Sequence, residues 1–145
     1  MIDRTIRELN HFIRNEEEMI ETLNYMVNEV EDPELKEILK GIQEDHFRQM
    51  MSMADRVYEL GGLPKIETGV LSREEVKSIR DKKDVTDLEN AKIALENEKN
   101  NTDRLSAYAD HTMDKTSLEL IEKATHAGQK NIEALMEYID RNQIQ

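Results

Sequence analysis

The chain of 145 residues is long enough for one domain with a hydrophobic core, and its 36% of charged residues with only five glycines and two prolines is typical of long amphipathic helices. It has no cysteine, which excludes disulfide bonds, zinc knuckles, iron–sulfur clusters and thiol catalysis. The net charge of −12 makes nucleic acids and anionic membranes unfavourable partners. Residues 1–18 lack an apolar run for export or membrane insertion, so we expect a cytoplasmic protein.

Apolar residues that recur every three or four positions predict two helices in the first part of the chain. The first is expected over about residues 3–30. The second is expected over about residues 33–60, because Asp32 can cap it and Pro33 suits its first turn. Gly61–Gly62 then ends this second helix.

Two further helices are predicted over about residues 86–111 and 116–141. Each begins with the pattern of a capping box, in which a threonine is followed three residues later by a glutamate. The two patterns are TDLE, from residue 86, and TSLE, from residue 116.

The connections between these helices differ in length. The first and second helices, like the third and fourth, are separated by a few residues, so each pair should form an antiparallel hairpin. Residues 61–85 are long enough to cross the whole bundle, and the segment SREEVKSIR within them is expected to form a short helix. The sequence therefore predicts an all-α four-helix bundle in a single domain, residues 1–145. A flexible linker between two independent hairpins is disfavoured, because an isolated hairpin buries too little apolar surface.

Two polar side chains interrupt the apolar face of the first hairpin. Glu16 has apolar residues at every helical-neighbour spacing, and His46 lies in the same stripe as Ile42 and Met50. Folding the hairpin about its turn places Glu16 opposite His46, at mid-height in the bundle. Gln43 lies one turn from His46 on nearly the same face.

The second hairpin repeats this pattern. Glu98 lies mid-helix between apolar residues, and the last helix carries Glu122, His126 and Gln129 along one side. Folding this hairpin about its turn is expected to bring His126 and Gln129 to within about one helical turn of Glu98.

A lone ionised carboxylate in a dry core costs several kcal/mol, so these groups need a compensating partner. A divalent metal is one solution, since carboxylates with imidazole suit iron, manganese or zinc. Buried salt bridges without metal, Glu16 with protonated His46 and Glu98 with His126, are the alternative. Copper(I) held by His46 and Met50 is a third and less favoured one, because methionine in such a seam is usually a packing residue.

The architecture resembles the ferritin-like superfamily, and the segments EVEDPELKEILKGIQEDH and YELGGLP are similar to segments of small ferritin-like proteins without an assigned activity. In the family pattern, one helix of each pair provides a glutamate and the other provides E-x-x-H, and together they hold two irons. Glu16 and Glu98 match the single glutamates, and His46 matches the first motif's histidine, but Gln43 stands where its glutamate would be.

The second motif also departs from the family pattern. Glu122 and His126 are four residues apart instead of three; aligned by apolar residues, His126 instead takes the glutamate position and Gln129 the histidine position. The resemblance implies iron oxidation or storage, or a role in oxidative stress, with dioxygen or peroxide as the oxidant. The departures leave one metal, an unequal pair or no metal open.

The sequence thus predicts a metal-binding ferritin-like protein that pairs with a second copy of itself through a helix face. The candidate ligands are Glu16, His46, Glu98, Glu122 and His126, with Gln43 and Gln129 as weak or supporting ligands. The alternative is a metal-free bundle that acts as a scaffold or partner-binding module.

Overall fold

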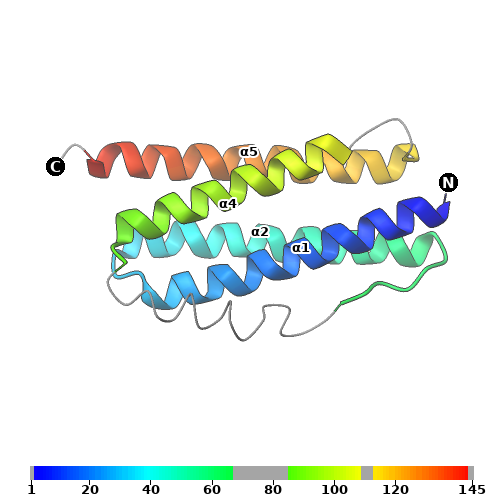
Figure 1. Cartoon of the computed structure of the whole chain (residues 1–145), viewed down its shortest axis with the longest axis horizontal. Helices are drawn as coiled ribbons and strands as arrows, with labels where there is room; N and C mark the ends of the chain where they lie inside the picture. Colours follow the sequence, from blue (N-terminus) through cyan, green and yellow to red (C-terminus); the bar gives the residue numbers. More distant parts are fainter. Residues whose placement is uncertain (1, 67–84, 109–112, 144–145) are drawn as a thin grey trace.

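A computed structural model describes residues 2–66, 85–108 and 113–143 of the chain. These residues form four α-helices and no strand, which confirms the all-helical class (Figure 1). The helices are α1 (Ile2–Glu29), α2 (Pro33–Glu59), α4 (Asp87–Tyr108) and α5 (Lys115–Gln143). Within the described ranges, no helix is both long and apolar enough to cross a bilayer.

Side-chain caps fix where three of the helices begin. Asp32 accepts a hydrogen bond from the Glu34 backbone N–H (3.0 Å), with Pro33 in the first turn of α2. Thr86 accepts one from the Glu89 backbone N–H (3.1 Å) at the start of α4. At α5 the capping residue is Asp114, which accepts from the Ser117 backbone N–H (3.0 Å), so this helix begins before the predicted TSLE pattern.

Contacts at the two ends of the bundle define the direction of each helix. The Asp87 carboxylate accepts hydrogen bonds from the backbone N–H groups of Glu31 (3.1 Å) and Asp32 (2.8 Å), which places the start of α4 beside the start of α2. The two helices therefore run in the same direction, as the colour sequence in Figure 1 shows. Since α2 has 27 residues, its end lies about 40 Å from the start of α4. The predicted short helix in the crossover falls within residues 67–84, outside the described residues.

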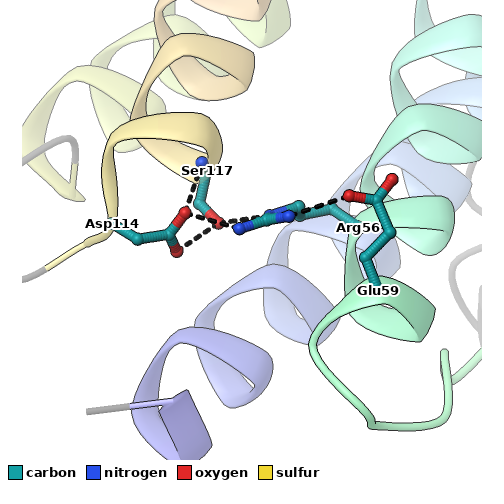
Figure 2. A network of polar contacts seen from close by, with 4 residues as sticks. All are labelled: Arg56, Glu59, Asp114 and Ser117. Carbon is teal, nitrogen blue, oxygen red and sulfur yellow. Dashed lines mark hydrogen bonds and ion pairs between the residues drawn. The ribbon is translucent and has the colours of Figure 1, made fainter.

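At the opposite end, a polar network joins α2 to the start of α5 (Figure 2). The Arg56 guanidinium donates to Asp114 (2.6 Å), to the Ser117 hydroxyl (3.0 Å) and to Glu59 (2.8 Å). Burial acts to raise the pKa of Asp114, but the hydrogen bonds from Ser117 and the contact with Arg56 outweigh it and lower the pKa to about 2. Asp114 thus caps α5 and ties it to α2.

The apolar core consists of two clusters separated along the bundle axis. The first lies around Phe12, Met53 and Ile121, and the second around Leu39, Ala91 and Leu135. Between the two clusters lies a layer of buried polar residues from all four helices, and this layer contains Glu16, His46, Glu98, Asn101, Thr102 and Asn131. The core is therefore interrupted at mid-height by polar groups.

Candidate functional site

Three ionisable side chains from three different helices meet in the polar layer. The Nδ1 atom of His46 (α2) contacts Glu16 (α1), and the Nε2 atom on the other side of the ring contacts Glu98 (α4). All three are inaccessible to solvent, with exposed fractions of 1% for His46 and 0% for both glutamates. We call this group the His46 centre.

The two contacts determine the protonation state of the imidazole. A ring whose two nitrogens both face carboxylates must donate from both, and only the protonated imidazolium has two N–H groups. Burial alone would lower the pKa of His46, but the charges of Glu16 and Glu98 and the hydrogen bonds to them raise it to about 10. Two carboxylates and one imidazolium leave a net charge of −1 in the centre.

The remaining oxygen atoms of the two carboxylates differ in their partners. Asn101 donates a long hydrogen bond from Nδ2 to Glu16 Oε1 (3.4 Å). Glu98 Oε2 is buried, and nothing among the described residues donates to it. The excess negative charge of the centre is therefore least compensated on the Glu98 side.

Gln43, one turn before His46, is half-buried and lies at the edge of this layer. Its amide nitrogen, Nε2, donates to the backbone carbonyl of Ile20 (3.1 Å), which ties α2 to α1. Gln43 is thus a neutral side chain that bonds to the backbone of α1.

The other three predicted site residues do not reach the His46 centre. Glu122, His126 and Gln129 are all exposed on α5. The sequence predicts His126 and Gln129 near Glu98, but both are exposed, and α5 buries a different stripe: Ile121, Ala124, Gly128, Asn131 and Leu135. The predicted metal-free pairing of Glu98 with His126 is likewise replaced by a contact with His46.

The register of α5 against α4 is set by a glycine. A Cβ atom on Gly128 would lie only 2.3 Å from Thr102 Oγ1, so the helices approach here closely enough to admit no larger residue without a shift. Antiparallel pairing from this contact places Asn131 about one turn along α5, toward the level of Glu98. The fourth helix thus contributes neutral groups to the polar layer.

Sequence reasoning also missed the amide and hydroxyl groups of the layer. Asn101 and Thr102 follow Glu98 by three and four residues, on the same buried face as Ala94 and Leu105. This spacing could have indicated that both residues belong to the buried polar layer, because polar residues in a buried stripe must find hydrogen-bond partners there. Thr102 Oγ1 and the Nδ2 atoms of Asn15 and Asn131 are buried with no hydrogen-bond partner in the described part of the chain.

The donor atoms of the centre do not converge on a single point. His46 directs its two nitrogens to opposite sides, and in the ranges that the structure covers no three carboxylate or imidazole groups form a ready-made metal site. A metal ion would have to replace a proton on the imidazole. Copper(I) binding through Met50 gains no support, since Met50 packs in the first apolar cluster.

Comparison with protein-family models finds no match, and comparison with curated proteins finds none either. The ferritin-like resemblance therefore stays a prediction from the sequence.

Proposed function

We propose that the protein binds one divalent transition-metal ion at the His46 centre, with iron as the first candidate and manganese or zinc as alternatives. The observation that carries this proposal is the buried charge of the centre. Two carboxylates and an imidazole, drawn from three helices, lie in a dry layer between two apolar clusters. Carboxylate and imidazole groups are suitable ligands for these metals.

Charge balance favours exchange of a proton for a metal ion. With the imidazolium the charge is −2 + 1 = −1, whereas a divalent ion beside the neutral imidazole gives −2 + 2 = 0. His46 through Nε2 and Glu98, whose buried Oε2 has no donor among the described residues, would hold the ion. Glu16 would keep its hydrogen bond with Nδ1 and so fix the orientation of the ring. Such an ion supplies Lewis-acid chemistry or, for iron and manganese, electron transfer.

The residues present do not fit a two-metal centre. Gln43 is neutral and bonded to the backbone. The buried face of α5 carries Gly128 and Asn131, while Glu122 and His126 are exposed. Two divalent ions would need more negative charge than Glu16 and Glu98 supply. We therefore propose a single-metal variant of the ferritin-like arrangement, built from two antiparallel hairpins and a long crossover.

The second candidate is a metal-free bundle that serves as a scaffold. It is favoured by one observation: the protonated ring of His46 already donates to one oxygen of Glu16 and to one oxygen of Glu98. In this alternative, the centre specifies the helix register, and partner binding occurs elsewhere on the surface.

Metal titration of the purified, chelator-treated protein separates the two candidates. Under anaerobic conditions, Fe²⁺, Mn²⁺ and Zn²⁺ would each be added in a weakly buffered solution at pH 7, with bound metal and released protons both counted. We expect one ion per chain and release of about one proton, since the imidazolium must lose one. Glu98→Gln should abolish binding while the protein stays helical by circular dichroism.

Two exposed residues of α5 provide matched controls for this titration. Glu122→Gln makes the same chemical change as Glu98→Gln outside the centre, and His126→Gln removes an exposed imidazole; both variants should bind metal as the unaltered chain does. Lack of saturable binding for all three metals would refute the proposal and favour the scaffold. Binding that survives in Glu98→Gln but is lost in His126→Gln would refute the assignment of the site.

We also expect the chain to pair with a second copy through the groove of about 660 Å³ between α2 and α5. Phe47 and Met51 are exposed there, and the charges lining the groove balance in a chain that is otherwise strongly acidic. The charged residues that line the groove are Asp45, Asp55, Arg48 and Lys123. Sedimentation equilibrium should show a dimer that Met51→Glu disrupts and that Met136→Glu, at an exposed position outside the groove, does not. A monomer at high concentration would contradict this expectation.

A further inference from the structure

The first half of α1 presents a row of basic side chains to the solvent. Their spacings of three, four and three residues place them on one side of the helix, and all four are exposed: Arg4, Arg7, His11 and Arg14. Between the first and the last of them, Glu8 is the one acidic residue, although the whole chain has a net charge of −12. We call these four residues the arginine row. It reverses the sign of the charge on this part of the surface.

A hollow of about 410 Å³ lies beside the arginine row, between α1 and the segment that follows α2. Arg7, His11 and Arg14 line it from α1, and Lys65 lines it from the other segment. The one carboxylate among the described lining residues belongs to Glu17, which is only 6% exposed. The exposed charges around the hollow are therefore positive.

The side chain of Asn10 holds the two walls of the hollow together. Its Nδ2 atom donates to the backbone carbonyl of Leu63 (3.3 Å), and its Oδ1 atom accepts from the backbone N–H of Lys65 (2.9 Å). These bonds fix the backbone of both residues against α1. The hollow is thus built by the fold, and a ligand does not have to order this segment when it binds.

Several of the basic groups are available to a ligand. Among the described residues, neither the Arg7 guanidinium nor the Lys65 ammonium has an ion-pair partner. Arg14 lies 3.8 Å from Glu18, and both of these side chains are about half exposed (55% and 41%), so this contact contributes little. An anion that enters the hollow therefore displaces no strong interaction.

The size of the hollow and the charge of the molecule indicate a small anion. A volume of about 410 Å³ lies within the range of about 300–1,000 Å³ that is usual for small-molecule sites. A nucleic acid or a membrane would also face the acidic remainder of the chain, whereas screening over about 8 Å leaves a small anion mainly in the field of the nearby basic groups. Guanidinium and ammonium groups are suitable donors to phosphate and carboxylate oxygens.

We infer that the hollow beside the arginine row binds a small anion that carries two or more phosphate or carboxylate groups. Arg7 and Lys65 contact the anionic groups from the two walls, and His11 and Arg14 supply further donors. Asn10 keeps the walls in position. The site does not use the metal proposed for the His46 centre, so failure of either proposal leaves the other standing.

Calorimetric titration of the chelator-treated protein with pyrophosphate and, separately, with citrate tests this site. At low ionic strength we expect one saturable site per chain for at least one of these probes. Arg7→Gln and Lys65→Gln should each weaken binding about tenfold, since each removes a charge-assisted contact. Arg141→Gln is the matched control, because it makes the same change of charge beside Glu34, at the opposite end of the bundle. It should change the affinity by less than about twofold.

A variant that leaves the net charge unchanged distinguishes a built site from diffuse attraction. Asn10→Ala removes both bonds to the segment after α2 and should weaken binding about fivefold. Asn24→Ala, at an exposed asparagine of α1 outside the hollow, should bind as the unaltered chain does. Circular dichroism should show the same helical content in all variants.

Four results would overturn the inference. They are the absence of saturable binding for both probes, equal weakening by Arg7→Gln and Arg141→Gln, and unchanged affinity in Asn10→Ala. The fourth is flotation with phosphatidylglycerol vesicles by a chain that has no affinity for either probe, which would make the arginine row a membrane contact.

Discussion

Replacement of His46 by glutamine should remove much of the stability of the metal-free protein. The substitution keeps a polar side chain of similar size but removes the positive charge that contacts Glu16 and Glu98. Loss of one partner from a buried ion pair costs about 3–5 kcal/mol, because the other charge stays buried without compensation. Domains of this kind have a free energy of unfolding of about 5–15 kcal/mol, so His46→Gln should lose about a fifth of it or more.

Urea unfolding followed by circular dichroism at pH 7, with chelator present, measures this loss. His126→Gln is the control, since the same change on the exposed face of α5 should alter the free energy of unfolding by less than about 0.5 kcal/mol. The triple variant Glu16→Met, His46→Leu, Glu98→Met should be at least as stable as the original chain, because apolar replacement of a whole buried ionic group is often neutral or stabilising. A loss below about 1 kcal/mol for His46→Gln, or a triple variant less stable than His46→Gln, would refute the account of the centre as a coupled ionic unit.

Three further predictions concern pH, helix packing and capping. The pKa of His46 is raised from 6.5 to about 10 in the folded protein, so the stabilising contribution of its charge is full below pH 6.5 and is lost as pH rises through 10. The free energy of unfolding should therefore fall by up to about 1.4 kcal/mol per pH unit between pH 7 and 10. Urea titrations should find no such slope in His46→Gln. Gly128→Ala should destabilise the unaltered chain, because the added methyl group would meet Thr102. In a Thr102→Ala background the same substitution should stabilise the chain by roughly 0.5–1 kcal/mol, because alanine favours the helix. Additive effects in a double-mutant cycle would contradict this packing. Asp114→Asn should cost about 1 kcal/mol, because the amide can still cap α5 but lacks the charge that pairs with the partly exposed Arg56. The contribution of the Asp114 charge is present above pH 3.8 and is lost as pH falls through about 2, whereas Asp140→Asn on the exposed surface should leave thermal melting unchanged.

The first hairpin could be predicted from its sequence down to individual side chains. Asp32 and Pro33 mark the turn unambiguously, and a turn of so few residues leaves one register for two long helices. Folding about that turn places Glu16 opposite His46, and the structure has this contact. Where a short capped connection joins two strongly periodic helices, local signals are thus sufficient to place groups that lie 30 residues apart.

The second hairpin could not be predicted in the same way. Its connection includes residues 109–112, and neither helix carries as strong an apolar pattern as α1. The buried stripe of α5 includes Gly128 and Asn131, which resemble surface or loop residues in a sequence. A prediction that assigns the buried stripe from apolar residues alone therefore places α5 in the wrong rotation about its axis. It directs His126 toward the core, whereas this residue is exposed.

This asymmetry between the hairpins explains why His46 contacts both carboxylates. Each of α1 and α4 places one glutamate in the polar layer, but only α2 supplies an imidazole, because close packing of α5 at Gly128 leaves no room for a large side chain there. Glu98 must therefore be compensated from across the bundle instead of from its own hairpin partner. One ring between two carboxylates leaves one negative charge in excess, and it is this excess, rather than the number of ligands, that favours exchange of the imidazole proton for a divalent ion.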